Sequence, residues 1–155
     1  MKKITTREMK WINKGKYKNL SYNRIEATGK NSYFYAISDE NFSFSSSHQL
    51  TNKNYSIYIS ISDITYIKFD IQENPIIIIS VKGYESKTVI SNNSLNYNDK
   101  INITLERYKN SFSFILQDKK ISEISLPAAE KAITFGFLFN NNDFAKIDDI
   151  KYRKK

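Results

Sequence analysis

Several polar side chains in this 155-residue chain have the types and alternate spacing that carbohydrate recognition uses. A tyrosine ring stacks on the CH face of a sugar, while hydroxyl, amide, carboxylate and ammonium groups bond to its hydroxyls. Tyrosine and threonine also favour strands for their own sake, so a purely structural face is the alternative. We therefore expect a ligand-binding face made by Tyr58, Tyr66, Lys68, Asn102, Thr104 and Glu106.

The single histidine, His48, is the next residue that could do chemistry. It lies in the serine-rich segment 45–54, which we interpret as a polar loop. No acidic partner is close to it in sequence, so a Ser-His-Asp arrangement is possible only in a formal sense. We expect a solvated loop histidine with no catalytic role.

Oxygen-rich residues near the C-terminus could hold a metal ion. Segment 140–143 and the pair Asp148 and Asp149 offer the amide and carboxylate oxygens that calcium accepts. Asn and Asp also fill turns for backbone reasons. We expect a polar turn and no cofactor, with calcium at Asp143 and Asp148 as the alternative.

The elements that position these groups are predicted to be β-strands, because apolar residues recur at every second position. The run from Pro75 to Ser80 contains four consecutive isoleucines and is expected to be a strand buried on both sides. Helical periodicity never exceeds about two turns, and 128–132 is the best helical candidate. The clearest predicted strands are 55–61 and 65–71, as a hairpin, and 101–106, 112–114, 133–139 and 145–152.

Length and composition limit the possible classes. The chain is long enough for one domain, which we place at 13–155 after an N-terminal lead-in at 1–12. It has no cysteine, so disulfides, thiolate metal sites and a cysteine nucleophile are excluded. The start is not an intact secretory signal, and the apolar runs are far shorter than the about 20 residues of a membrane span. An extracellular or cell-surface location would require a removed leader.

The net charge of +8 is concentrated at the two ends of the chain. Residues 1–18 carry seven Lys or Arg against one Glu, and 151–155 carry four more, so the body between them has a net charge of −2. A nucleic-acid binder usually spreads its cations along a groove, so nucleic acid is not an expected partner. If the first and last strands lie side by side, they would form one local anion-attracting patch.

Segment 100–120 has a turn at 108–110 and the run Asp118-Lys119-Lys120. It resembles a hairpin of the concanavalin A-like lectin/glucanase superfamily of jelly rolls, which often have D-G-K at that place and which include laminin G-like modules. Segments 133–137 and 145–152 resemble their closing strands, and 11–17 resembles their first strand. The resemblance and the strand pattern together predict an all-β fold, a two-sheet antiparallel jelly-roll sandwich with little or no helix.

The same superfamily contains lectins, carbohydrate-binding domains and family 16 glycoside hydrolases. Those hydrolases present carboxylates from one strand as E-x-D-x-(x)-E, since retention needs two of them about 5 Å apart. This chain has no such strand, so we expect a non-catalytic carbohydrate-binding module of a larger secreted, surface or phage protein. A structural or protein-docking domain, partnered by another domain or protein, is the alternative. A divergent glycosidase is the second alternative.

Overall fold

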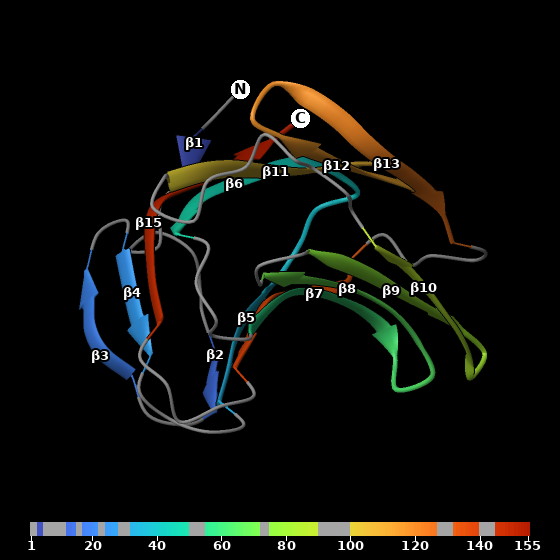
Figure 1. The fold of residues 1–155 in the computed structure, drawn as a ribbon, viewed down its shortest axis with the longest axis horizontal. Coiled ribbons are helices and arrows are strands. Elements are labelled where there is room, and N and C mark those ends of the chain that lie inside the picture. The colour runs from blue at the N-terminus through green and yellow to red at the C-terminus, as the bar shows by residue number, and fades with distance from the viewer. Residues whose placement is uncertain are drawn as a thin grey trace.

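Alternating apolar and polar residues fold into antiparallel strands that form two sheets packed face to face (Figure 1). The computed structural model describes residues 3–4, 12–14, 17–21, 24–27, 32–49, 55–71, 75–89, 100–126, 132–139 and 145–155. These residues contain strands and turns and no helix, so the predicted β-sandwich is confirmed. The helical candidate at 128–132 lies almost entirely outside the described residues.

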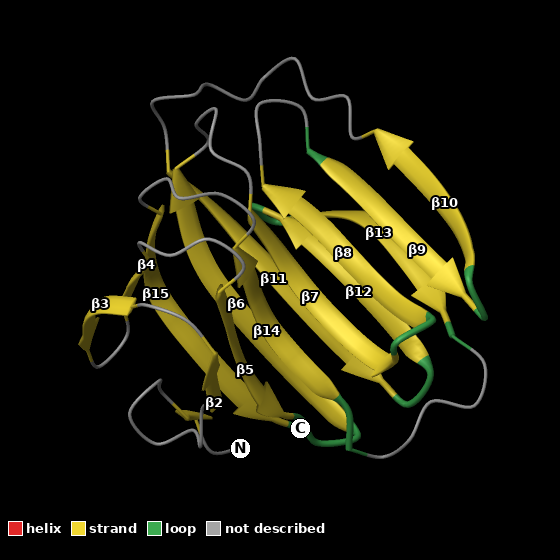
Figure 2. Cartoon of the chain, turned by 90° about the horizontal axis from the view of Figure 1, so that it is seen from below, coloured by secondary structure: helices red, strands yellow, loops and turns green. Residues whose placement is uncertain are grey.

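In Figure 1 sheet A runs along the top and curves down the left side, and sheet B lies beneath it. In spatial order, sheet A contains β13 (Lys119–Ser125), β12 (Ser111–Leu116), β11 (Lys100–Tyr108), β6 (Asn41–Gln49), β15 (Ala145–Lys154), β4 (Arg24–Ala27) and β3 (Tyr17–Ser21), with β1 (Lys3–Ile4) also paired to β15. Sheet B contains β10 (Tyr84–Val89), β9 (Ile76–Val81), β8 (Thr65–Ile71), β7 (Tyr55–Ser62), β14 (Thr134–Phe139), β5 (Ser32–Ile37) and β2 (Ile12–Lys14). Figure 2 shows the two sets of strands one behind the other.

The space between the sheets is filled by the apolar member of each alternating pair. The predicted hairpin is present as β7 and β8, with Ile59 opposite Ile67 and Ile57 opposite Phe69. All four of these side chains are buried. Five aromatic rings face them from sheet A: Phe42, Phe44, Phe112, Phe114 and Tyr152. Phe135 and Phe137 on β14 are buried beside them in sheet B. Apolar burial between the layers therefore determines which face of each strand remains outside.

Two of the predicted elements differ in the structure. The segment interpreted as a polar loop from Ser45 continues the strand, because β6 extends to Gln49 and pairs with β11 along its whole length. The run after Pro75 is not buried on both sides: Ile77 faces the core, whereas Ile76 and Ile78 are half-exposed. Strand β9 is therefore covered by sheet A on one face only.

A bulge in β15 changes the alternation of the last strand. Asp148 pairs with Ser47 and Lys151 with Ser45, and the extra residue is accommodated where Asp149 has a φ of 52°. Because of this bulge, Ile147, Ile150 and Tyr152 are all buried although the first two are three residues apart. Lys151 and Arg153 are consequently left on the outer face of sheet A.

Candidate functional site

Three of the predicted ligand-binding residues meet on the outer face of sheet B. Tyr58 on β7 and Tyr66 and Lys68 on β8 are half-buried, and the two tyrosine rings lie 5.8 Å apart, centroid to centroid. The ammonium of Lys68 lies 5.0 Å from the ring centre of Tyr66 and 5.7 Å from that of Tyr58. They gather because Tyr58 pairs directly with Lys68, and Tyr66 precedes Lys68 by one strand period.

Hydrogen-bonding groups surround this aromatic cluster. The hydroxyl of Tyr66 donates to Oε2 of Glu85 on β10 at 3.0 Å. Burial and the neighbouring Glu85 both raise the pKa of Tyr66 above its usual value. The hydroxyl of Ser56 donates to the carboxylate of Asp70 at 2.5 Å, which orients that acid on the same face. The face thus combines the two rings, the ammonium of Lys68 and the carboxylates of Asp70 and Glu85, and Lys87 pairs with Glu85 there at 3.9 Å.

The other three predicted residues lie on the opposite side of the molecule. Asn102, Thr104 and Glu106 are on β11, and their side chains are on the outer face of sheet A. The hydroxyl of Thr104 donates to Oδ1 of Asn102 at 3.2 Å, and the ammonium of Lys155 pairs with Glu106 at 3.5 Å. The six residues therefore form two separate groups, one on each outer face of the sandwich.

The metal candidates are placed only in part. Asp143 lies outside the described residues. Asp148 is buried, and its Oδ2 accepts a bond from the Lys100 ammonium at 2.8 Å. Within the described segments no group of three or more His, Cys, Asp or Glu side chains is arranged to hold a metal ion. Calcium binding stays a prediction.

His48 is not the solvated loop histidine that the sequence suggested. It is completely buried on β6, where Nε2 lies 2.7 Å from the Ser46 hydroxyl and Nδ1 lies 2.6 Å from the Tyr55 hydroxyl. Removal from water lowers the pKa of His48 to about 3, against a smaller opposing effect of Asp148. The Ser46–His48 contact is that of a nucleophile and its base, yet both residues are sealed in the core. Since no substrate reaches it there, the pair serves the fold.

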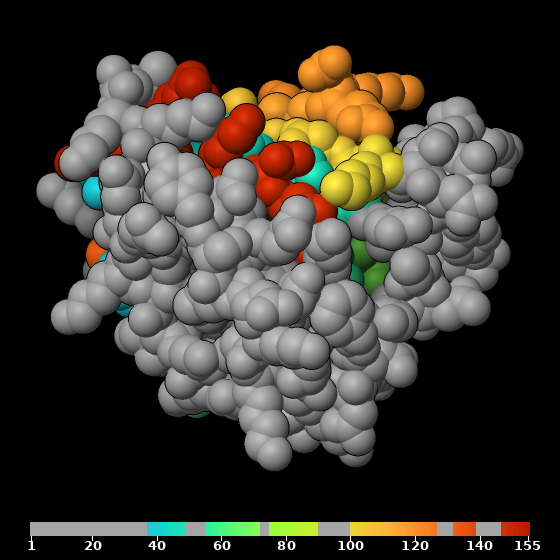
Figure 3. All heavy atoms as spheres, turned by 90° about the vertical axis from the view of Figure 1, so that its left-hand side faces the viewer, coloured from blue at the N-terminus to red at the C-terminus, as the bar shows by residue number. Residues whose placement is uncertain are grey.

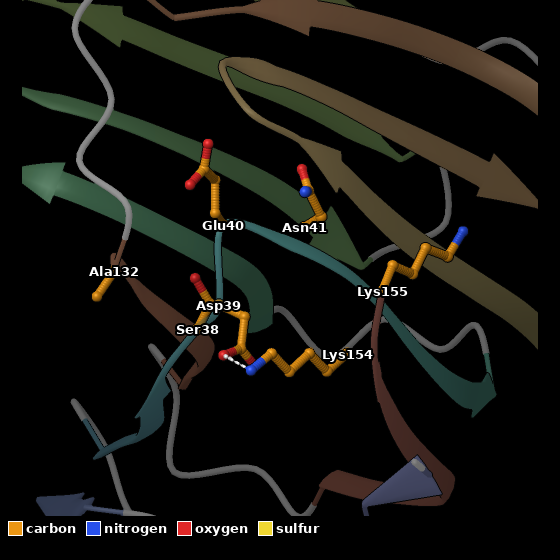
Figure 4. A pocket seen from close by; sticks show the side chains of 7 residues that line it. All are labelled: Ser38, Asp39, Glu40, Asn41, Ala132, Lys154 and Lys155. Atoms are coloured by element: carbon orange, nitrogen blue, oxygen red, sulfur yellow. Dashed lines mark ion pairs between the residues drawn. The ribbon is translucent and has the colours of Figure 1, made fainter. Parts of the chain in front are cut away.

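A hollow of about 350 Å³ lies where the chain passes from β5 to β6. Figure 4 shows the carboxylates of Asp39 and Glu40 pointing in different directions, with Lys154 beside the first. Asp39 pairs with the Lys154 ammonium at 3.7 Å and also accepts the Tyr152 hydroxyl at 2.7 Å. One of the two carboxylates in this hollow is therefore already occupied by partners.

Two further carboxylates, those of Glu106 and Glu123, line a hollow of about 310 Å³ between β11, β12 and β13. Glu106 pairs there with Lys155, and Glu123 with Lys120 at 3.4 Å. The Ser111 hydroxyl and then Lys120 lower the pKa of Glu123. A glycosidase acid needs the opposite shift, because it must hold a proton near neutral pH.

The described residues contain no helix that is long and apolar enough to cross a lipid bilayer.

Several solved structures of low sequence identity have a fold similar to that of this chain. No protein-family model matches the chain, and no curated protein matches its sequence. The carbohydrate-binding module CBM66 from Bacillus subtilis is similar with a TM-score of 0.64 and 12% identity, over 94% of this chain and 96% of that chain. Chicken galectin 2 is similar with a TM-score of 0.55 and 10% identity, over 72% and 89%.

An enzyme is also among the similar structures. The xylan β-1,4-xylosidase from Bacillus halodurans matches with a TM-score of 0.69 and 10% identity, over 86% of this chain and 33% of that chain. At such identities the likeness concerns the fold alone. The chain thus has the β-sandwich that a carbohydrate-binding module, a galectin and one part of a xylosidase share.

Proposed function

We propose that this chain is a non-catalytic carbohydrate-binding module, part of a larger secreted, surface or phage protein, that binds sugar on the outer face of sheet B. The observation that carries the proposal is the Tyr58–Tyr66 pair with the Lys68 ammonium close to both ring centres, at 5.7 and 5.0 Å. The rings would stack on the CH faces of pyranose units. Lys68 and the carboxylates of Asp70 and Glu85 would bond to the sugar hydroxyls. The fold shared with a carbohydrate-binding module supports this assignment.

A panel of soluble polysaccharides tests the proposal by affinity gel electrophoresis of the whole chain. We expect at least one polysaccharide to retard the protein, and Tyr58→Ala and Tyr66→Ala each to weaken that affinity about tenfold, since a ring contact is lost. Tyr84→Ala is the matched control, because Tyr84 is a surface tyrosine on β10 with 85% exposure. All variants should keep the wild-type melting temperature within a few degrees.

Two outcomes would refute the assignment. One is that no polysaccharide retards the wild-type chain; the other is that the Tyr58 and Tyr66 variants bind as well as the Tyr84 control. The docking alternative predicts the first outcome together with a self-associated or partner-bound species in size-exclusion chromatography. The glycosidase alternative predicts new reducing ends when the protein is incubated with the retarding polysaccharide, and we expect none.

A further inference from the structure

Three neighbouring strands of sheet A, β11, β6 and β15, carry a hollow on the outer face of the sandwich. Its volume is about 250 Å³, several times the roughly 30 Å³ of a water molecule in the liquid. Three small hydroxyl side chains and two long cationic side chains line it. The lining residues are Ser43, Ser45, Thr104, Lys151 and Arg153.

Strand register gathers these residues from distant parts of the sequence. Ser45 lies directly opposite Thr104 on one side and Lys151 on the other. Ser43 lies opposite Arg153 in the adjacent position. Residues paired in this way have Cβ atoms about 4.5–5.5 Å apart. The β15 bulge puts both cations on this face. Figure 3 shows the red atoms of β15 beside the cyan atoms of β6 and the yellow atoms of β11.

The two cations of the hollow differ from the two that follow them in sequence. Lys154 pairs with Asp39, and Lys155 pairs with Glu106. Among the described residues no carboxylate lies within ion-pair distance of Lys151 or Arg153. Glu106, opposite Ser43 on the next strand, is held by Lys155 at 3.5 Å. The hollow therefore presents positive charge that the described part of the protein does not neutralise.

The ends of the chain meet beside the hollow. Strand β1 pairs with β15, and its backbone places Lys3 opposite Arg153. The condition for a local anion-attracting patch, that the first and last strands lie side by side, is thus fulfilled. The hydroxyls of Ser43 and Ser45 have no bonding partner among the described groups, so both can donate to a ligand.

We propose that this hollow binds a tetrahedral oxyanion, a sulfate or phosphate group. Arg153 offers a fork of N–H donors that matches two oxygens of such a group, Lys151 offers a point charge, and the two serine hydroxyls donate to the remaining oxygens. The two cations, on adjacent positions of one strand face, suit one oxyanion rather than the spaced phosphates of a polymer backbone. This site lies on the opposite sheet from the tyrosine cluster and does not depend on it.

The test is a titration of the ¹⁵N-labelled chain with sodium sulfate, sodium phosphate and sodium acetate at constant ionic strength. We expect saturable shifts of the Ser43, Ser45 and Thr104 amides with sulfate and phosphate, and none with acetate. The double variant Lys151→Gln/Arg153→Gln should weaken binding at least about tenfold. The control Lys87→Gln/Lys119→Gln removes two exposed charges on β10 and β13, outside the hollow, and should leave the affinity for sulfate and phosphate unchanged.

Shifts that rise without saturation, equal shifts with acetate, or an equal loss of binding in both double variants would overturn the proposal.

A further experiment identifies the source of the anion. Retardation by dextran sulfate but not dextran, lost in Lys151→Gln/Arg153→Gln, would assign an ester carried on a polysaccharide, whereas saturation by the inorganic ions alone would assign a free anion. Tyr58→Ala should leave the binding of sulfate and phosphate unchanged. Failure of the oxyanion proposal can therefore be distinguished from failure of the proposed sugar site.

Discussion

The hydroxyl of Tyr55 lies 2.6 Å from Nδ1 of His48, and this bond joins the two sheets across the core. On its other side the imidazole contacts the Ser46 hydroxyl at 2.7 Å. A neutral imidazole has one donor and one acceptor nitrogen, so it can satisfy both hydroxyls at once. Protonation would leave a charge in the core with both nitrogens as donors. The polar chain Ser46–His48–Tyr55 is therefore stable only while His48 is neutral.

Acid should weaken the fold through His48. Its pKa is about 3 in the folded chain, against the ordinary histidine value of 6.5 in the unfolded chain, so the unfolded chain binds the proton first as pH falls. The stability contribution is complete above pH 6.5 and is lost progressively toward pH 3. We expect a loss of about 2 kcal/mol between pH 7 and pH 5, measured by urea unfolding.

Two measurements isolate this effect from the titrating carboxylates. The variant His48→Gln does not titrate, so its stability should fall less between pH 7 and pH 5. The chain has one histidine, so its ring resonances are unambiguous in NMR spectra. Those resonances should not shift between pH 8 and pH 5, and a midpoint near 6.5 would contradict the buried neutral state.

Tyr152 should stabilise the connection between β5 and β6 through its hydroxyl. The hydroxyl donates to Oδ2 of Asp39 at 2.7 Å and accepts the bond from the Asp39 amide at 2.8 Å. Tyr152→Phe keeps the ring that stacks on Phe42 and Phe135 but leaves both Asp39 groups without this partner. We expect it to cost about 1–2 kcal/mol in urea unfolding. Tyr108→Phe, at an exposed tyrosine, should change nothing, and equal stabilities of the two variants would refute the role.

The two-residue turn between β9 and β10 contains a lysine, Lys82, whose replacement can stabilise the fold. Lys82 and Gly83 both have positive φ, 51° and 89°, as a type I′ turn requires. Lysine is strained there, whereas asparagine tolerates the left-handed region. Lys82→Asn should therefore stabilise the chain by about 0.5 kcal/mol. Gly83→Ala should cost about 1 kcal/mol from backbone strain alone, since a Cβ there would meet nothing within 4 Å. Chemical denaturation of both variants measures the sign of each change in the free energy of unfolding. A destabilised Lys82→Asn variant would contradict the assignment of a type I′ turn.

Alternation in the sequence predicted strands and faces well where the partners are local. Tyr58, Tyr66 and Lys68 belong to one hairpin, so a period of two residues was sufficient to bring them together. The segment from Ser45 to Gln49 was interpreted wrongly as a loop, because its buried members Ser46 and His48 are polar. Their partner Tyr55 reaches them from the other sheet, and no local pattern records that bond.

Period-two patterns also say which residues share a face but not which sheet the strand joins. For that reason Asn102, Thr104 and Glu106 were grouped with the tyrosines, although β11 lies in sheet A. The bulge at Asp149 and the pairing of β1 with β15 were equally invisible in the sequence. Hydrophobic periodicity, a local property of the chain, determined the fold class and the inner and outer sides of regular strands such as β7, β8 and β11. The hollow with Lys151 and Arg153 was decided only by the tertiary structure, since long-range pairing and one extra residue in β15 select which strands become neighbours.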